Sequence, residues 1–564
     1  MDQIITLKHK ERTIKVPIGT RVEQVVETLK LNPEQISYAD NPVIGLRMNN
    51  EILSFGAKLM VDADIEPIKL FSDIGKRMYR HTLSYLLAYA CEQVFPDRRI
   101  IVGHALGDGF YYTFEGIQTL EAQDVKLLSD TLQKLVDADI RIHQGTVSYQ
   151  MALEHFNRKG YVATELLLSY RNDPTLELYR CGDFMDITYE PLLPRTSIVA
   201  IWQLRPYGQR GMLLRYPLSK NNFQSIIPFR DNPLLFSVFQ ENKNWGNILK
   251  VNCLGEMNAI CGTNQIFTFI RMNEDLQHRR IAEIADMVHD KETVKVVFIA
   301  GPSSSGKTTF AIRLAIQLRL LGYDPIQISL DNYYRPKDQA PRDADGKPDL
   351  EALEALDLNL FAQNLNALYA GESVDLPKFE FKENGRRFYE NKPIRMQKNT
   401  ILVIEGIHGL NPRLIPGIDR NTTFKIYISA LTQLNLDDHN RISTTDNRIL
   451  RRIVRDNRTR STSAQMTLEM WPSVERGESL HIFPFQNQAD VMINSALEYE
   501  LPVLKPYVEP LLKTVKPHAY LAYPTARRLL GFLENVYPIP ADLVPTESLL
   551  REFIGGSEFH KECH

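Results

Sequence analysis

The residues best suited to chemistry form one glycine-rich run in the second half of the chain. Gly301 is followed, after four residues, by Gly306-Lys307-Thr308. Glycines at this spacing let backbone N–H groups close around phosphate oxygens. The lysine can reach the outer phosphates of a nucleoside triphosphate, and the threonine hydroxyl can bind Mg²⁺. The residues expected to bind the nucleotide are Gly301, Ser303, Ser304, Ser305, Gly306, Lys307, Thr308 and Thr309.

The segments on either side of this loop are the ones that a phosphate-binding loop needs. Residues 296–300 are an uninterrupted apolar run, which predicts a buried strand, and 310–321 carry apolar residues at helical spacing. A helix that begins at the loop adds the partial positive charge of its N-terminus. Further apolar runs alternate with helical stretches beyond it, which favours a parallel sheet flanked by helices.

A carboxylate follows the next apolar run. Residues 326–330 predict a strand, and Asp331 comes directly after it. Open α/β sheets bind their ligands at the carboxyl ends of the strands. A carboxylate at that edge can accept the proton of an attacking hydroxyl or hold Mg²⁺. Asp331 is therefore a candidate general base beside the phosphate loop.

These motifs resemble the uridine kinase and phosphoribulokinase family of P-loop kinases. The glycine loop followed by Ser329-x-Asp331-x-Tyr333-Tyr334 carries the resemblance, which extends over roughly 293–500. It implies that Asp331 is the base for the 5′-hydroxyl of a nucleoside. Glu405 ends another apolar run and matches the family's acidic residue near Mg²⁺, which it would hold together with Thr308.

Two further segments match the family's substrate-binding segments. The resemblance assigns the ribose hydroxyls to Glu354, with Asp357 as second choice, although this acidic stretch can also be a solvated helix face. The segment from Pro377 corresponds to the base-binding segment, in which aromatic rings stack on a nucleobase. Phe379 and Asn384 replace the family's tyrosine and histidine, so a different or looser base preference is expected. The implied substrate residues are Asp331, Tyr333, Glu354, Asp357, Phe379, Phe381, Asn384 and Arg386.

Residues 446–460 contain six arginines in fifteen positions. Such a run can be a solvated helix or an RNA-binding face. Its position after the Glu405 strand matches the family's lid, whose arginines neutralise charge on the transferred phosphoryl group. Thr462 stands where a further lid arginine is expected. The implied catalytic residues are Asp331, Lys307, Glu405, Arg452, Arg455 and Arg460.

The first 65 residues predict a small β-rich unit. Strands are expected at 4–7 and 13–16, followed by a helix with Val22 and Val25 on its apolar face. Asn49-Asn50 lies between two short apolar runs, which predicts a hairpin turn. This order resembles the ubiquitin-like TGS domain found at the front of threonyl-tRNA synthetases.

Residues 66–225 resemble the second additional, or editing, domain of threonyl-tRNA synthetase. The resemblance rests on three motifs, at 80–87, 107–112 and 182–186. In that family a His-x-x-x-His pair and a Cys-x-x-x-His pair form the site. His81 is kept here, whereas Tyr85, Thr188 and Leu192 occupy the other three positions. Because zinc needs three or four ligands, no zinc is expected. Dimerisation, regulation and small-ligand sensing remain open as roles.

Length and composition limit the remaining possibilities. A chain of 564 residues exceeds one core, and its net charge of −3 attracts neither nucleic acid nor membrane as a whole. The five cysteines are scattered, and no apolar run is long enough to span a membrane, so a cytoplasmic protein is expected. Gly555-Gly556-Ser557 predicts a flexible end. The expected divisions are 1–65, 66–225, a connector at 226–292, the kinase domain at 293–500 and a helical tail at 501–564.

The sequence thus predicts a multidomain α/β protein whose C-terminal half is an ATP- and Mg²⁺-dependent nucleoside kinase. A homo-oligomer is compatible with this prediction, and nucleic acid is not an expected partner. One alternative is a P-loop kinase for another small hydroxyl acceptor, such as a sugar phosphate. The other is an RNA-binding or tRNA-editing-derived regulator with a nucleotide switch. The base, the sugar and the choice between ATP and GTP stay open.

Overall fold

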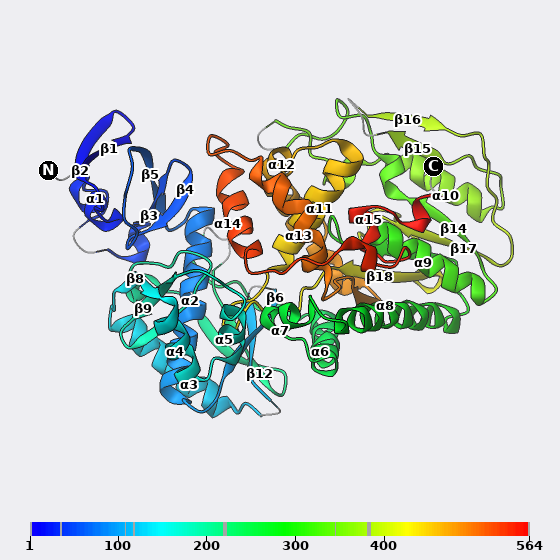
Figure 1. Cartoon of the computed structure of the whole chain (residues 1–564). Coiled ribbons are helices and arrows are strands. Elements are labelled where there is room, and N and C mark those ends of the chain that lie inside the picture. The colour runs from blue at the N-terminus through cyan, green and yellow to red at the C-terminus, as the bar shows by residue number, and fades with distance from the viewer. Residues whose placement is uncertain are drawn as a thin grey trace.

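The structure is a computed structural model, shown in Figure 1, that describes residues 3–33, 36–107, 109–116, 119–217, 223–343, 346–380 and 385–561. Within them the strands form five sheets, of which the largest parallel one lies in the C-terminal half. This confirms the predicted α/β class. None of the helices in these ranges is long and apolar enough to span a membrane.

The N-terminal unit is a five-stranded sheet with one short helix packed on it. The strand order is β2-β1-β5-β3-β4. Its elements are β1 (Ile4–His9), β2 (Arg12–Pro17), α1 (Val22–Thr28), β3 (Val43–Met48), β4 (Glu51–Ser54) and β5 (Ala63–Lys69). Asn49 and Asn50 join β3 to β4 and both have positive φ, 46° and 68°. The left-handed geometry that asparagine tolerates is the one a two-residue hairpin needs, so the predicted turn is confirmed.

The next part packs two antiparallel sheets around a long helix. The sheets have the orders β10-β9-β8 and β11-β12-β7-β6. The elements are α2 (Asp73–Val94), β6 (Ile100–Leu106), β7 (Gly109–Phe114), α3 (Ala122–Asp137), β8 (Ile142–Ser148), α4 (Tyr149–Lys159), α5 (Val162–Leu168), β9 (Thr175–Cys181), β10 (Phe184–Asp186), β11 (Gln203–Tyr207) and β12 (Gly211–Arg215). Helix α2 supplies much of the core that both sheets share.

Three helices connect this part to the kinase-like half: α6 (Pro233–Leu249), α7 (Leu254–Ile260) and α8 (Gln265–Asp290). The longest of them, α8, covers most of the second half of the connector predicted at 226–292. Its apolar stripe, with Ile281, Ile284 and Val288, is buried in the same core as the following sheet. In Figure 1, α8 runs along the outside of the C-terminal half.

The C-terminal half is built on a five-stranded parallel sheet of order β14-β17-β13-β18-β19. Alternate side chains of β13 enter different cores. Val297 and Ile299 pack on the α8 and α9 side, whereas Val296 and Phe298 pack on the α10 side. This is the burial on both faces that a parallel sheet requires. The elements are β13 (Val296–Ala300), α9 (Lys307–Leu320), β14 (Asp324–Ser329), α10 (Leu358–Tyr369), β15 (Pro377–Glu380), β16 (Arg386–Tyr389), β17 (Thr400–Glu405), β18 (Thr423–Ser429), α11 (Thr444–Arg460), α12 (Ala464–His481) and β19 (Val491–Asn494).

The chain ends in three helices that return to this half: α13 (Glu500–Lys513), α14 (Tyr523–Leu533) and α15 (Arg551–Ile554). Helix α14 lies between the N-terminal sheet and the helices beside the parallel sheet (Figure 1). The flexible end predicted at 555–557 is wrong. Phe553 is fully buried and Ser557 is 7% exposed, because this segment packs beside α9 and α11.

Candidate active site

The loop between β13 and α9 has the geometry of a phosphate cradle. Gly301 cannot carry a side chain, since an added Cβ would lie 2.0 Å from the Ile428 carbonyl oxygen. Ser304 and Gly306 both have positive φ, 60° and 81°, which turns the loop back toward the start of α9. The buried hydroxyls of Ser304 and Ser305 have no hydrogen-bond partner among the described residues. The loop thus keeps polar groups that an anion can satisfy.

Lys307, the first residue of α9, folds over this loop. Its Nζ donates to the carbonyl oxygens of Gly301 and Pro302, each at 3.1 Å. Burial lowers the pKa of Lys307, and the charges of Glu405 and Asp331 oppose that effect. The lysine is therefore within electrostatic reach of both predicted carboxylates.

The carboxylates lie at the carboxyl ends of two neighbouring parallel strands, as the sequence predicts. Glu405 ends β17, is 8% exposed, and accepts a hydrogen bond from Ser329 Oγ at 2.6 Å. Burial and the charge of Asp331 raise the pKa of Glu405 to about 7. A desolvated carboxylate next to a second one favours a cation.

The donors present here fit Mg²⁺. Glu405 and Asp331 offer carboxylate oxygens, and Thr308 is exposed at the start of α9 with its hydroxyl available. No group of three or more His, Cys, Asp or Glu side chains in the described ranges is placed to hold a metal ion. Mg²⁺ commonly uses only one or two carboxylates and takes its other ligands from water and substrate phosphates. Thr308 and Glu405 are the residues that would hold it.

The three predicted lid arginines meet around one buried aspartate on α11. Arg452 and Arg455 donate to the Asp456 carboxylate at 3.2 and 2.8 Å, and Arg460 lies 3.6 Å from it. Burial alone would raise the pKa of Asp456, but the three guanidinium groups hold it below its usual value. Arg452 also donates to Ser303 Oγ at 3.1 Å, so this cluster touches the phosphate loop.

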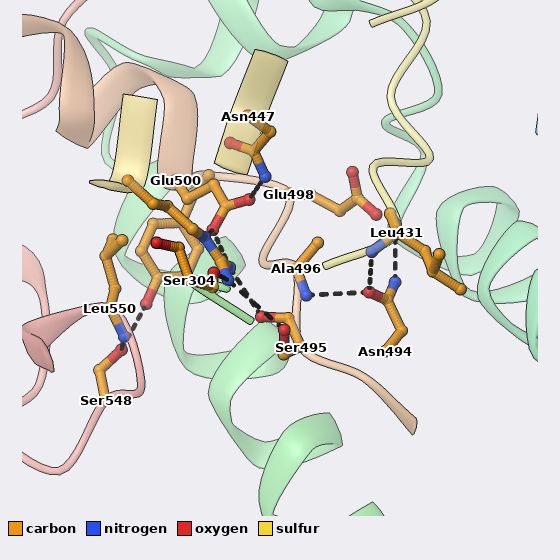
Figure 2. A network of polar contacts seen from close by, with 12 residues as sticks. Ser304, Leu431, Asn447, Asn494, Ser495, Ala496, Glu498, Glu500, Ser548 and Leu550 are labelled. Carbon is orange, nitrogen blue, oxygen red and sulfur yellow. Dashed lines mark hydrogen bonds and ion pairs between the residues drawn. The ribbon is translucent and has the colours of Figure 1, made fainter. Parts of the chain in front are cut away.

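Two other arginines of the same helix hold the backbone of the loop, which the sequence did not indicate. Arg448 donates to the Ser303 carbonyl at 2.8 Å, and Arg451 to the Ser304 carbonyl at 3.3 Å. Arg448 is paired with Glu478 and Arg451 with Glu500, and all four side chains are buried. Figure 2 shows the network around Ser304 and Glu500. The sequence shows the six arginines, but it does not show which of them point toward the phosphate loop.

The two carboxylates expected to bind the ribose, Glu354 and Asp357, are each paired with an arginine. Glu354 points to Arg413, 2.5 Å away, and its side chain is about half exposed. Asp357 caps α10 by accepting from the Leu360 N–H at 3.1 Å and pairs with Arg387. Neither side chain reaches the loop.

Glu351, earlier in the same acidic stretch, has its carboxyl group buried within electrostatic range of Arg452, Lys307 and Asp331. Burial raises its pKa to about 7, and the charges of Arg452 and Lys307 act on it. Its Oε2 is buried without a hydrogen-bond partner among the described residues. The only sequence signal was its membership of the acidic run that contains Glu354.

The two tyrosines after Asp331, Tyr333 and Tyr334, have different surroundings. Tyr333 is 1% exposed, packs on Phe361 with ring centres 5.0 Å apart, and accepts from Asn364. Tyr334 instead lies where Asp331 and Glu351 raise its pKa in addition to burial. Tyr333, a predicted substrate residue, thus lies in the core, and Tyr334 lies within electrostatic range of Asp331.

The hairpin of β15 and β16 contributes Phe379. Its ring centre is 6.2 Å from that of Tyr334, and its N–H donates to the Asn332 side chain at 3.2 Å. Arg386, on β16, is exposed. Phe381 and Asn384 lie outside the described residues. The structure therefore brings one of the two expected phenylalanines next to the acceptor side.

In the synthetase-like half, the four positions that correspond to the family's site are occupied by side chains that mostly contact the protein itself. The Tyr85 hydroxyl donates to the carbonyls of Tyr179 and Phe184 at 2.8 and 3.3 Å. Thr188 donates to the Glu190 carbonyl at 2.6 Å, and Leu192 is 1% exposed. Burial lowers the pKa of His81 to about 4, so the imidazole is neutral at pH 7.

The strand ends, the cradle and the arginine helix together define a P-loop kinase domain. Residues 296–501 match the phosphoribulokinase/uridine kinase family. A solved structure described as a possible uridine kinase from Bacillus stearothermophilus is 17% identical, with 36% of this chain and 89% of that chain covered and a TM-score of 0.24.

The N-terminal part is similar to threonine–tRNA ligases. That of Desulforamulus reducens is 28% identical over 181 residues, which cover 32% of this chain and 28% of the ligase. That of Vesicomyosocius okutanii is 29% identical over 190 residues, or 33% of this chain and 29% of the ligase. The chain thus spans less than a third of the length of these curated relatives.

Proposed function

We propose that the chain is an ATP- and Mg²⁺-dependent kinase that transfers the γ-phosphoryl group to the 5′-hydroxyl of a nucleoside. The observation that carries the proposal is the position of Asp331. Its charge acts on Lys307 at the phosphate loop and on Tyr334 at the aromatic side. A base between a phosphate cradle and a ring-lined acceptor pocket is what this transfer requires.

In this proposal each group has a defined task. Asp331 accepts the proton of the hydroxyl that attacks the γ-phosphorus, and the bond from that phosphorus to the β,γ-bridging oxygen breaks. Thr308 and Glu405 would hold Mg²⁺, which would supply positive charge to neutralise the phosphates. Lys307 and the Arg452 cluster stabilise the negative charge of the moving group. The work of the protein is therefore positioning and electrostatics.

The acceptor side supports a nucleoside over a sugar phosphate. Tyr334 and Phe379 offer two aromatic rings for a base, and Glu351 offers a carboxylate for a ribose diol. Of the arginines near this side, Arg387 is paired with Asp357, and Arg452 is bonded to Asp456 and to the phosphate loop. We therefore infer that an uncharged acceptor fits this side better than a sugar phosphate. The Tyr85 region does not favour a regulator derived from tRNA editing, because the Tyr85 hydroxyl donates to a backbone carbonyl.

The test is phosphoryl transfer from MgATP to a panel of ribo- and deoxyribonucleosides and sugar phosphates. We expect turnover of one nucleoside class only. Lys307→Ala serves as the blank, because it removes the cation at the phosphates while leaving the acceptor pocket in place. Turnover of a sugar phosphate with no nucleoside turnover would contradict the proposed acceptor.

A further inference from the structure

The last segment of the chain lies on the phosphate loop. Glu552, on α15, accepts two hydrogen bonds from Thr309 at the start of α9 through the same carboxylate oxygen. The backbone N–H of Thr309 donates at 3.2 Å and its hydroxyl at 2.8 Å. Thr309 is 1% exposed and Glu552 8%, so this contact is closed to water.

The hydrogen-bond donors that Glu552 occupies are ones that would otherwise donate to a phosphate. The backbone N–H of Thr309 is one of the first in α9 and has no acceptor within the helix. Free N–H groups at a helix N-terminus after a glycine loop bind the phosphates nearest the nucleoside. A carboxylate at this position is stabilised by the same helix dipole that stabilises a phosphate.

A second contact of this segment reaches the loop itself. Leu549 packs on Gly306, where an added Cβ would lie 2.5 Å from Leu549 Cδ2. The charge of Glu552 also acts on Lys307 and on Glu405. Residues 549–552 are therefore close enough to the predicted nucleotide site for their charge to affect its side chains.

The arginine helix holds the segment in this position. Arg458 donates to the carbonyls of Glu552 and Phe553 at 2.8 and 3.2 Å. The Arg451 guanidinium lies 4.9 Å from the centre of the Phe553 ring. Ser548 lies 3.3 Å from the Tyr499 hydroxyl, in the network of Figure 2. One face of α11 thus binds the tail, while Arg452, Arg455 and Arg460 gather at Asp456 of the same helix.

We propose that Glu552 is a built-in competitor of the nucleotide. Its carboxylate occupies the Thr309 donors in place of a phosphate oxygen, and the nucleotide binds fully only when residues 548–555 withdraw from the loop. The structure is accordingly the low-affinity state of the kinase. This inference rests on the proposed nucleotide-binding function.

The test is the affinity for MgATP of the full-length protein and of Glu552→Gln and Glu552→Ala, measured by calorimetry. We expect both variants to bind about twofold to thirtyfold more tightly, the range expected for losing one helix-terminal hydrogen-bonding partner. Arg458→Gln, which keeps Glu552 but frees the carbonyls behind it, is expected to change the affinity in the same direction. Glu558→Gln is the matched control, since Glu558 lies on the same tail and its side chain accepts a hydrogen bond from the Thr546 hydroxyl at 2.8 Å, away from the phosphate loop.

Amide hydrogen exchange provides an independent readout on the native protein. Addition of MgATP is expected to raise exchange across residues 548–555. Unchanged or weaker affinity in the Glu552 variants would make this residue a structural cap and overturn the inference while the kinase proposal stands. Failure of the native protein and of every variant to bind MgATP would overturn both.

Discussion

The P-loop region and the His81 region, defined here by Tyr85, Thr188 and Leu192, differ in what these named side chains contact. In the P-loop region, the hydroxyls of Ser304 and Ser305 have no hydrogen-bond partner within the part of the chain that the structure describes, and burial and neighbouring charge raise the pKa of Glu405 to about 7. In the His81 region, the hydroxyls of Tyr85 and Thr188 donate to nearby carbonyls. Buried polar groups without partners are costly, and in the P-loop region a bound phosphate would satisfy them.

Both halves resemble known families, but the resemblance means different things in each. In the C-terminal half, the side chains proposed to do the chemistry, such as Lys307 and Glu405, lie at or near the phosphate loop. In the N-terminal half, the scaffold remains and the ligand positions have become packing, with Leu192 fully enclosed. Similarity of fold and similarity of function therefore separate within one chain.

The largest expected effect tests the chemistry of the P-loop region. Asp331→Asn is predicted to lower kcat by about 10²–10⁴-fold, because the amide cannot accept the proton of the attacking hydroxyl. Binding of MgATP, measured by calorimetry, should persist. A variant that kept its kcat would show that Asp331 is not the base and would weaken the contrast between the two regions.

A matched pair of glutamates tests the acceptor side. Glu351→Gln is predicted to raise the KM for the nucleoside by about tenfold to a hundredfold, since it weakens charge-assisted hydrogen bonds to the ribose. Glu354→Gln changes a surface ion pair with Arg413 and should alter that KM by less than about twofold. Steady-state kinetics on both variants decides between them. The reverse order would restore Glu354 as the ribose residue.

The pH dependence of nucleotide binding tests the raised pKa of Glu405. A carboxyl group whose pKa is about 7 is neutral below that pH and ionises as the pH rises through it. MgATP affinity is therefore expected to fall by roughly tenfold from pH 8 to pH 6, as one proton competes with the cation. Ser329→Ala removes a hydrogen bond that lowers this pKa, so the midpoint should move to higher pH.

Calorimetry across this range, with Glu351→Gln as the control, checks that prediction. The control should keep the pH dependence, because its own carboxyl group is gone while Glu405 remains. A flat profile in the native protein would show that Glu405 does not bind the cation.

The smallest effect belongs to the His81 region. Tyr85→Phe removes a buried hydroxyl that donates to two carbonyls, which should lower the free energy of unfolding by about 1–2 kcal/mol. Phosphoryl transfer should not change, because the site is in the other half. Thermal unfolding and kinase assays on the same samples test both statements. A tenfold loss of kcat would show that the two regions are coupled.

Much of the kinase half could be predicted from local patterns. The strand at 296–300, the glycine loop, and the carboxylates after β14 and β17 are each encoded by neighbouring residues, and a parallel sheet brings strand ends to one edge. Facing was harder to predict. Which of Glu351 and Glu354, and which of Tyr333 and Tyr334, lies near the phosphate loop depends on how short turns pack. Spacing in a sequence does not encode this.

The sequence by itself determined which residue types are present: a phosphate loop, acidic strand ends, an arginine-rich helix, and a synthetase-like half that keeps His81 but none of the other three expected ligand residues. Only the tertiary structure decided which of those side chains meet. Glu552 and Thr309 are 243 positions apart, and no local pattern predicts their contact. Such a contact exists because hydrophobic packing of Leu549 and Phe553 brings the tail to the loop, and packing between distant segments is a property of the folded chain.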